Sequence, residues 1–448
     1  MSELQKTQLF NWSEAPLNAF AAHEPTSFVD GPFGSDLKVS DYAESGVRIL
    51  QLQNLGDGYF LDDNVKYAPE RKAQSLSRCL VRPGDLLIAK MADPLARACI
   101  VPPHLAKGLI VADLIKLRLD REHDATFICS AINGTEFRRE AERLATGTTR
   151  TRISLSTLKR IRLRAPKPKE QRRIGDIVRT LDETTRQSEA LIAKYQQIKL
   201  GLMHDLFTRG ATANGNLRPT RAQAPHLYKD SPLGWIPKEW EVVPLSSVTQ
   251  FITSGSRGWA EYYSEVGPQF IRIGNLTREH INFRWDSVTR VSLPKFTEGQ
   301  RTAVLPNDIL ISITADLGIV AVAGNALGEA YVNQHIALVR PRVEPEVSRF
   351  LGHFLSTVRV YKQFLRLNDS GAKAGLNLPA VGKILVVKPL DDLEPKRVAA
   401  MLDEVDLTIE CHKQEVVKLR QQKHGLMQDL LTGRVRVKVS GEAITSAG

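Results

Sequence analysis

Three short loops, each of which contains or follows a glycine, carry side chains that could hold a phosphate backbone. The first, Gly31-Pro32-Phe33-Gly34-Ser35, can form a tight turn whose backbone N–H groups reach phosphate oxygens. The second, Thr148 to Arg152, combines hydroxyl and guanidinium donors, and the third, Ser254 to Arg257, offers the same donor types. Arginine also reads base edges in the major groove. The residues expected to contact DNA, in these loops and in matching places, are Gly31, Gly34, Ser35, Lys90, Thr148, Thr149, Arg150, Arg152, Ser254, Ser256, Arg257 and Lys373.

A catalytic constellation does not accompany these loops. The sequence contains no phosphate-binding GxxxxGKS/T motif, no HExxH motif and no Cys and His at metal-ligand spacing. The Asn/Asp-Pro-Pro-aromatic motif with which amino-methyltransferases hold a flipped base is also missing, and Val101–His104 is the nearest segment. Asp85 and Lys90 faintly resemble part of a nuclease site, but the second carboxylate beside the lysine is missing. We therefore expect no catalysis and no metal or cofactor bound by this chain.

The charge balance permits a polyanionic partner. Lys and Arg number 61 against 50 Asp and Glu, which gives a net charge of +11. Ten of the basic residues lie between Arg150 and Arg173, where Glu170 is the single acid. Within this segment, Arg160 to Arg164 alternates basic and apolar residues, as a strand with one cationic face would. Two interpretations stay open: a strip that faces phosphates, and a solvated edge strand whose charges oppose aggregation.

Length and composition indicate several folded domains. At roughly 150 residues per domain, 448 residues suggest about three units, and 42% hydrophobic residues argue against a largely disordered chain. No apolar run approaches the roughly 18 residues of a membrane span, and the first residues lack the features of a secretory signal. The four cysteines are scattered without a CxxC pair, as reduced core residues would be. We expect a soluble cytoplasmic protein with no membrane partner.

The second half of the chain repeats the first. Four segments recur in the same order at offsets of 221 to 228 residues, close to half the chain length. The clearest pair is Lys199–Thr208 with Lys423–Thr432, which share the pattern Gly-Leu-Met-x-Asp-Leu. These helical ends match closely, whereas the globular parts share only short strand-like segments. Two copies of one scaffold with different surfaces suit a protein that reads two unlike targets.

The elements predict an α+β protein: two duplicated mixed α/β domains separated by two long helices. Buried strands are expected at 86–89, 111–117, 309–312 and 332–338, and helical segments at 124–146 and 345–366. The polar stretch between the halves favours a linker. The expected divisions are a first globular domain at 1–165, a first long helix at 166–210, a linker at 211–235, a second globular domain at 236–388, a second long helix at 389–433 and a C-terminal tail at 434–448.

The two long helices share one apolar register. From about Pro168 to Phe207, side chains alternately three and four residues apart form an a/d seam, and adding 224 to each number gives the second seam. Ser188/His412 and Lys199/Lys423 interrupt the two seams at equivalent positions. Either these residues fix the register of an antiparallel coiled coil roughly 60 Å long, or the seams drift and they face water. The main seam residues are Leu181, Ile192, Tyr195, Leu202, Val405, Val416, Leu419 and Leu426.

Together these features resemble the DNA-specificity subunit of type I restriction–modification systems. The resemblance rests on Asp30–Ser35, on Pro166 to Asp182 leading into the first long helix, on Gly201–Thr208 with its copy, and on Leu233–Pro237. It implies two target-recognition domains, each reading one half of a split, asymmetric DNA site. It also implies that the two helices, as an antiparallel coiled coil, act as a spacer and as the docking surface for modification subunits.

The resemblance further implies partners and cofactors outside this chain. The expected partners are double-stranded DNA, two modification (methyltransferase) subunits that carry S-adenosylmethionine and methylate adenine, and restriction/translocase subunits that use ATP and Mg²⁺. The family's specificity subunit is not catalytic, which agrees with the missing motifs. The second half departs from the family pattern at Ser254-Gly255-Ser256, which replaces the fuller first loop, and at Glu394-Pro395, which replaces Glu170-Gln171. The resemblance therefore supports phosphate contacts in the second half less strongly than in the first.

Two alternatives from other functional classes are weighed against this one. A single-chain DNA enzyme would show activity of the purified chain with Mg²⁺ or S-adenosylmethionine. A coiled-coil scaffold with protein-binding globular ends would bind its partner without DNA and with little dependence on salt, whereas contacts to phosphates make affinity fall steeply as salt rises.

Overall fold

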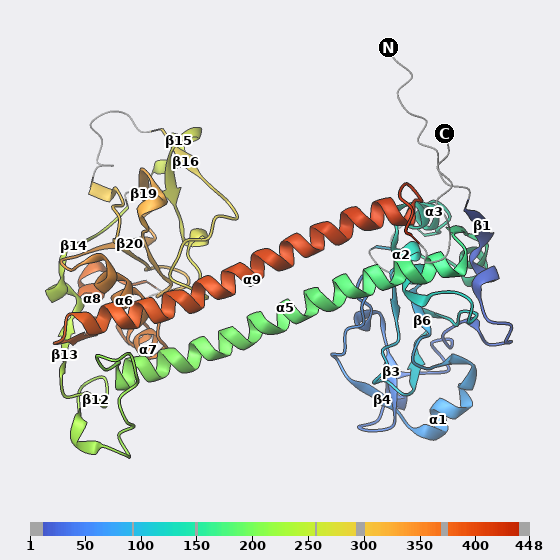
Figure 1. Ribbon diagram of the computed structural model, residues 1–448, viewed down its shortest axis with the longest axis horizontal. Coiled ribbons are helices and arrows are strands. Elements are labelled where there is room, and N and C mark those ends of the chain that lie inside the picture. Colours follow the sequence, from blue (N-terminus) through green and yellow to red (C-terminus); the bar gives the residue numbers. More distant parts are fainter. Residues whose placement is uncertain are drawn as a thin grey trace, which may run out of the picture. The chain divides into compact units, whose positions relative to one another are not determined.

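Two compact units make up the chain (Figure 1). Unit 1 consists of residues 1–189 and 414–448, and unit 2 consists of residues 190–413. Both contain helices and sheets, so the protein is an α+β protein with two domains. No helix in the described part of the chain is long and apolar enough to cross a membrane. The structure, a computed structural model, describes residues 12–91, 94–147, 151–255, 258–292, 301–368 and 375–438.

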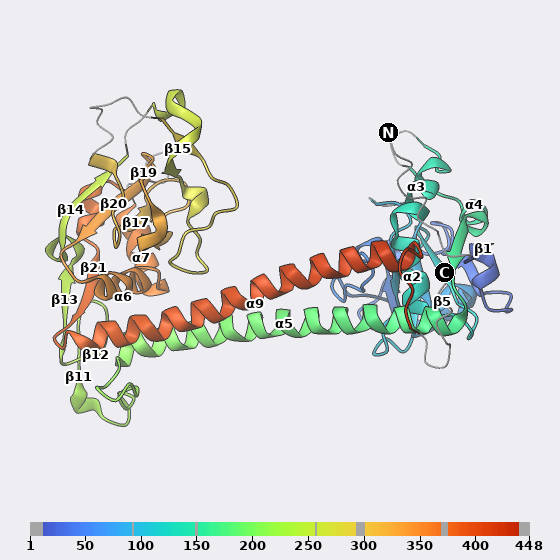
Figure 2. The ribbon, with the colours of Figure 1, turned by 45° about the horizontal axis from the view of Figure 1, so that its top comes forward.

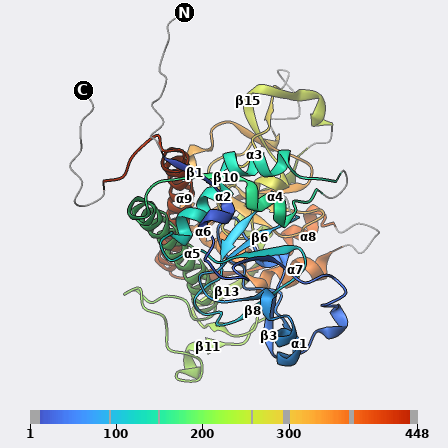
Figure 3. The same ribbon diagram turned by 90° about the vertical axis from the view of Figure 1, so that its right-hand side faces the viewer.

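Unit 1 is built on two four-stranded sheets and a two-stranded ribbon, with strand orders β2-β9-β6-β7, β4-β3-β8-β5 and β1-β10. Helix α2 packs on β7, and α4 packs on the short 3-10 helix that follows β1. Helices α2, α3 and α4 are labelled in Figure 3. The strands are β1 (Ser13–Pro16), β2 (Phe28–Asp30), β3 (Val47–Leu50), β4 (Lys66–Ala68), β5 (Leu80–Val81), β6 (Leu86–Ala89), β7 (Ala98–Ile100), β8 (Gly108–Ile110), β9 (Leu114–Leu117) and β10 (Arg162–Ala165). The shorter helices are α1 (Glu70–Ser75), α2 (Ala125–Asn133), α3 (Thr135–Arg143) and α4 (Leu155–Arg160).

Unit 2 contains sheets with strand orders β14-β20-β17-β18, β16-β15-β19, β13-β21 and β11-β12 (Figure 2). Its helix α6 packs on β18 and β21. The strands are β11 (Tyr228–Lys229), β12 (Ile236–Pro237), β13 (Trp240–Pro244), β14 (Thr249–Ser254), β15 (Tyr263–Ile271), β16 (Arg290–Val291), β17 (Ile309–Ser312), β18 (Val320–Val322), β19 (Ala330–Val332), β20 (Ile336–Pro341) and β21 (Leu385–Pro389). The shorter helices are α6 (Pro345–Leu355), α7 (Val358–Leu367) and α8 (Leu378–Gly382).

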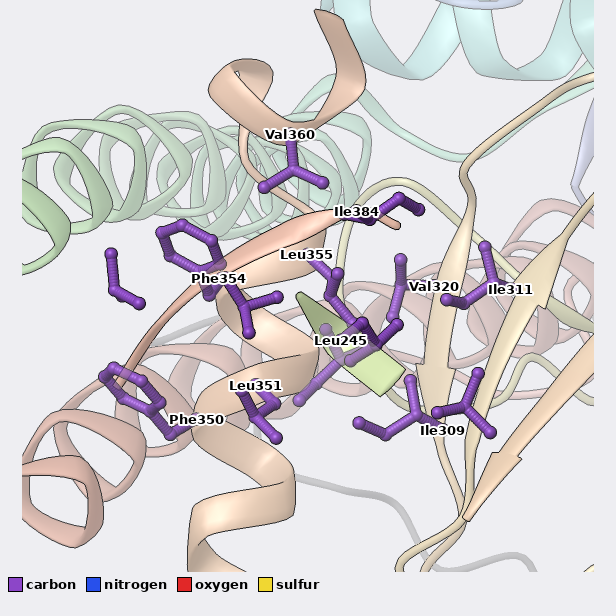
Figure 4. Close-up of a cluster of buried hydrophobic side chains, with 14 of the residues drawn as sticks. Leu245, Ile309, Ile311, Val320, Phe350, Leu351, Phe354, Leu355, Val360 and Ile384 are labelled. Atoms are coloured by element: carbon purple, nitrogen blue, oxygen red, sulfur yellow. The ribbon is translucent and has the colours of Figure 1, made fainter. Parts of the chain in front are cut away.

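The central strands form because short apolar runs are buried on both faces. All four residues of β6 and all four of β9 are buried. Lys116 is the one charged residue of β9. Its Nζ donates to Arg78 O at 2.7 Å and to Leu80 O at 2.9 Å. Burial lowers the pKa of Lys116. In unit 2, β17 is equally buried and contributes Ile309 and Ile311 to a core that α6 completes (Figure 4). The strand expected at 111–117 begins only at Leu114.

Each helical segment expected from the sequence is in fact two helices. Between α2 and α3, Gly134 adopts an extended conformation and its N–H bonds to Ala131 O. Between α6 and α7, Thr357 is extended and its side chain accepts a hydrogen bond from Val360 N. The helical segments predicted at 124–146 and 345–366 are therefore confirmed, and each is divided in two because glycine disfavours a helix interior and threonine favours an N-cap.

Matching buried ion pairs occupy equivalent places in the two units. In unit 1, Asp85 accepts two hydrogen bonds of 2.9 Å from Arg118, and in unit 2 Asp308 accepts bonds of 2.8 and 2.7 Å from Arg340. Both aspartates are buried, and these hydrogen bonds raise the pKa of each arginine. Asp85, considered above as a nuclease carboxylate, therefore holds a strand in place. Across the described residues, no group of three His, Cys, Asp or Glu is arranged to hold a metal ion.

The long helices α5 (Pro168–Arg209) and α9 (Leu393–Leu431) contribute to both units. Within unit 1, Asp182 pairs with Lys423, and Ser188 donates to Glu415 at 3.3 Å. Because the partner numbers fall along α9 as they rise along α5, the two segments in unit 1 run in opposite directions. Within unit 2, where Tyr195 of α5 stacks on His412, the partners follow the same descending order.

Two expectations need correction, one about the apolar seam of α9 and one about the stretch 211–235. Leu426, assigned to the apolar seam, is 40% exposed, whereas Leu430, four residues on, is buried in the core of unit 1. A straight helix drifts about 20° per heptad from a strict 3.5-residue repeat, so a seam extrapolated over many turns leaves the contact face.

The stretch 211–235 is not a simple linker either. Ala211, Tyr228 and Leu233 are buried, and Arg218 forms an ion pair with Glu394.

Candidate nucleic-acid interface

Several residues meet at one edge of the β2-β9-β6-β7 sheet of unit 1. Asp30 ends β2, Lys90 follows β6 and Asp113 precedes β9. Because β9 is antiparallel to both neighbours, these three positions lie at the same edge. The Nζ of Lys90 lies 3.1 Å from Asp30 Oδ2, and its backbone N–H donates to Asp113 O at 2.9 Å.

Two arginines complete this group. Arg152 Nη2 lies 3.6 Å from Asp113 Oδ1, and the next residue, Ile153, donates its N–H to Lys90 O at 3.0 Å. Arg78 Nη1 lies 3.5 Å from Asp30 O. We call the five residues Asp30, Arg78, Lys90, Asp113 and Arg152 the cationic edge. Its three cations outnumber its two acids, and the arginines are 45% and 56% exposed.

The glycines of the first loop have different roles. A Cβ on Gly31 would lie 1.9 Å from Val111 O, so only glycine fits there, and its N–H already donates to Leu114 O at 2.9 Å. The prediction that this N–H reaches phosphate is therefore wrong, because the sheet uses it. Gly34 lies in open space, and Ser35 is exposed with its hydroxyl 3.4 Å from Asp36 Oδ1. Gly34 and Ser35 thus lie on an accessible loop that Gly31 anchors beside the cationic edge.

The corresponding edge of unit 2 has a different chemistry. A Cβ on Gly255, which follows β14, would lie only 2.0 Å from Val332 O, so this glycine repeats the close approach of Gly31. His335 takes the place of Asp113 before the matching strand, and its Nδ1 lies 2.8 Å from Thr314 Oγ1. Gln334 Nε2 lies 3.1 Å from His335 Nε2. We call Ser254, Thr314, Gln334 and His335 the polar edge.

The structure therefore groups some of the predicted DNA contacts and adds others. Gly31, Gly34, Ser35, Lys90 and Arg152 lie at one edge of unit 1, and Ser254 lies at the matching edge of unit 2. Arg78, Thr314, Gln334 and His335 are not among the predicted contacts. His335 could have been found by aligning the two halves through Gly31 and Gly255. Arg78 could not, because it comes from a distant segment that only the fold brings to the cationic edge. The predicted contacts Thr148, Thr149, Arg150, Ser256, Arg257 and Lys373 lie outside the described residues.

The basic segment before α5 has the alternation expected of it. In β10, Arg162 and Arg164 are exposed while Leu163 and Ala165 are buried, and the strand pairs with β1. Arg162 lies 3.4 Å from Glu14 Oε1, so one of these cations is neutralised by the neighbouring strand. The strand thus presents a cationic face. Both interpretations of that face, phosphate contact and protection of an edge, are compatible with this arrangement.

Comparison with known proteins places the chain in a family. The family model for the type I restriction modification DNA specificity domain matches residues 106–199 and 237–421, which is more than half of the chain. The chain belongs to this family. The type I restriction enzyme MjaVIII specificity subunit of Methanocaldococcus jannaschii is 23% identical over 338 residues, covering 74% of this chain and 75% of that protein.

A further relative and two solved structures resemble this chain. A second Methanocaldococcus jannaschii protein, named provisionally as the MjaX specificity subunit, is 26% identical over 289 residues. That match covers 64% of this chain and 62% of the relative. The chain thus spans less than two thirds of the length of this relative. The crystal structure of the type I restriction–modification S subunit from M. genitalium has a TM-score of 0.58 at 15% identity, covering 95% and 98% of the two chains. A chain from a study of assembly and conformational transition of the type I R-M system has a TM-score of 0.51 at 18% identity, with the same coverage.

Most of the predicted seam residues of α5 and α9 are at least half-buried. Ser188 and Lys199, the polar residues within the first seam, are 4% and 7% exposed and do not face water. Val416 is buried. The seam residues that are half-buried are Leu181, Ile192, Tyr195, Leu202, Val405 and Leu419.

Proposed function

We propose that this chain is the sequence-specific DNA-binding subunit of a type I restriction–modification complex, and that unit 1 and unit 2 each read one half of a bipartite, asymmetric site. The observation that carries this proposal is the pair of matching sheet edges with different side chains. Lys90 and Arg152 supply cations for phosphates and guanine acceptors, whereas Gln334 and His335 supply groups that both donate and accept. One scaffold with two such edges suits two unlike half-sites.

The two long helices are proposed to form an antiparallel coiled coil produced by duplication of one half. The ion pairs Asp182–Lys423 and Lys199–Asp406 support this, because each residue of one pair lies 224 positions from its counterpart in the other. We further propose that helix length sets the spacer between the half-sites. Inserting four residues in both helices should lengthen the recognised spacer and leave the half-sites unchanged, and an unchanged spacer would contradict this role.

The helices are also proposed to dock two modification subunits. In unit 2, a cavity of about 430 Å³ lies beside the Lys199–Asp406 pair, and apolar side chains such as Met203 and Ile409 line it. In unit 1, a cavity of about 450 Å³ lies beside the Asp182–Lys423 pair. Two similar cavities at matching places suit two copies of one partner. The domain divisions are proposed as 1–165, 166–210, 211–235, 236–388, 389–433 and 434–448, with 211–235 folded onto unit 2 rather than free.

The chain itself is proposed to be non-catalytic and cytoplasmic. S-adenosylmethionine is then held by the modification subunits, and ATP and Mg²⁺ are used by restriction/translocase subunits. This division of labour agrees with the family and with the lack of catalytic motifs in the sequence.

A binding selection tests the DNA-reading function. The complex of this chain with its modification subunits is incubated with random duplexes, and the bound duplexes are sequenced after several rounds. We expect two short conserved blocks separated by a fixed unspecified gap, with an affinity that falls steeply as salt rises. Enrichment of no sequence, with binding that does not depend on salt, would instead favour the protein-binding scaffold.

A further inference from the structure

An exposed aromatic ring lies next to the cationic edge of unit 1. Phe33 is 76% exposed, and Val39, which begins the 3-10 helix after this loop, is 79% exposed. Every other large apolar side chain in the described part of unit 1 is 58% exposed or less. Exposed apolar area of this kind is unfavourable in water, and burying it against a partner would be favourable.

The loop holds the ring in a defined place. Gly31 packs against Val111 with no room for a side chain, and Pro32 is buried. Beyond the ring, Asp36 N–H donates to Phe33 O at 2.8 Å and closes a turn, and Leu37 packs against the core of the second sheet. Phe33 is therefore presented to solvent by a turn that is anchored on both sides.

In unit 2, the first aromatic residue after the matching glycine is buried. The glycine equivalent to Gly31 is Gly255, and the first aromatic residue after it is Trp259. Trp259 is only 6% exposed and stacks on Phe270 with a centroid distance of 5.0 Å. An aromatic residue near this position can thus be buried, and Phe33 is not.

We propose that Phe33 contacts the base pairs of the half-site that unit 1 reads; this inference rests on the proposed DNA-binding function. The cations Arg78, Lys90 and Arg152, gathered beside the loop, attract the phosphates of the same duplex. An uncharged ring adds a contact that phosphates cannot make. Phenylalanine is used in this way as a wedge between base steps and as an apolar contact to the thymine methyl group. DNA is favoured over a protein partner because three cations lie at this edge, and the two arginines among them are 45% and 56% exposed.

The test compares F33A and F33L with the unchanged chain in the complex with its modification subunits. Binding to a fluorescent duplex that carries the recognised site is measured over a range of salt concentrations. We expect F33A to lower the specific affinity about tenfold, the size of one lost base contact, and to leave non-specific binding unchanged. Its salt dependence should keep the same slope, whereas K90A and R152A should each reduce the slope by about one. F33L should retain part of the affinity.

Val65→Ala is the matched control, because Val65 is 47% exposed and precedes β4 of the other sheet. It should bind DNA like the unchanged chain. Two duplex probes distinguish the contact: thymine-to-uracil replacement reproduces the F33A loss if the ring meets a methyl group, and 2-aminopurine fluorescence rises on binding if the ring enters a base step.

Two results would overturn the proposal. The first is F33A with unchanged affinity and unchanged sequence preference in a complex whose unchanged form binds its site specifically. The second is an F33A chain that unfolds like the unchanged chain but fails to assemble with the modification subunits, which would make the ring a protein contact. Failure of the proposed function is a separate outcome, since the unchanged complex would then prefer no duplex at all.

Discussion

Lys199 Nζ lies 2.5 Å from Asp406 Oδ1 in unit 2, where the two side chains are 9% and 3% exposed. Lys199 also donates to Glu279 O at 2.7 Å. At the equivalent place in unit 1, Lys423 pairs with Asp182, but these side chains are 25% and 45% exposed. The same two residue types thus form a buried pair in one unit and a solvated pair in the other. The energetic consequences of breaking them should differ accordingly.

Substituting the two lysines by methionine should have unequal effects. K199M leaves Asp406 buried without its cation, which should lower the free energy of unfolding by about 3–5 kcal/mol. K423M removes a solvated pair and should cost less than about 1 kcal/mol. Urea unfolding of the two variants provides the comparison, and equal destabilisation would contradict the assigned burial.

Two glutamates at the starts of the long helices should also differ. Glu394 accepts hydrogen bonds from Ala211 N at 2.8 Å, from Trp240 Nε1 at 3.0 Å and from Arg218. Glu170, its counterpart, is 5% exposed; its Oε2 lies 3.5 Å from Arg436 Nη2, and its Oε1 has no hydrogen-bond partner among the described residues.

Replacing these glutamates by glutamine tests that difference. E394Q loses charge-assisted bonds to buried donors and should destabilise unit 2 by about 2–3 kcal/mol. E170Q removes an incompletely satisfied buried charge and should be neutral or slightly stabilising. Thermal unfolding of both variants measures this, and a larger loss in E170Q than in E394Q would count against the structure.

The two glycines of the first loop should respond differently to alanine. G31A places a methyl group 1.9 Å from Val111 O, so the backbone must move, and we expect a loss of about 1–3 kcal/mol in unfolding free energy. G34A meets nothing within 4 Å and should leave stability unchanged. Differential scanning calorimetry of the pair is sufficient, and equal melting temperatures would refute the close approach at Gly31.

Stability of unit 2 should depend on pH through His353. His353 is fully buried, and its Nε2 lies 2.8 Å from Asp403 Oδ1. Burial lowers the pKa of His353 below its usual 6.5, although Asp403 and Asp406 oppose this and Lys199 adds to it. Burial raises the pKa of Asp403, but hydrogen bonds from His353 and Arg349 outweigh it and leave that pKa at about 2. Asp403 is therefore ionised from pH 7 down to pH 5.

The sign follows from the lowered pKa of the histidine. Below pH 6.5 the unfolded chain takes up a proton on His353 that the folded chain does not, so stability is complete above that pH and falls below it. The loss approaches about 1.4 kcal/mol per pH unit. H353Q should remove this contribution when unfolding is compared at pH 7.5 and 5.5, and H104Q, at an exposed histidine of unit 1, should not. An unaltered pH dependence in H353Q would exclude this role.

Much of the architecture is predictable because its signals are local. The apolar run of β6 and the helical periodicity of α5 are contained in short windows of sequence, and the repeat at 224 residues identifies their counterparts. The break at Gly134 is not predictable in this way, because a single glycine within an otherwise helical pattern does not by itself mark an end. The packing of 211–235 is not predictable either, because Arg218 finds its partner Glu394 176 residues away.

The candidate interface was only partly predictable for the same reason. Glycine content identified the first loop, but its sequence does not reveal that Gly31 uses its N–H within the sheet. Arg78 reaches the cationic edge from a segment 48 residues from Asp30, so no spacing rule finds it. His335 could be reached by aligning the halves, since it stands where Asp113 stands in the first.

A methylation map tests the central claim most directly. The chain is expressed with its modification subunit in cells that lack adenine methylation, and the genome is sequenced with detection of modified bases. We predict methyladenine in one asymmetric motif made of two short blocks with a fixed gap. An R152A variant, which loses a phosphate contact, should lower the extent of methylation without changing either block. A soluble, co-purifying complex that adds no methylation would contradict the account and leave the protein-binding scaffold in its place.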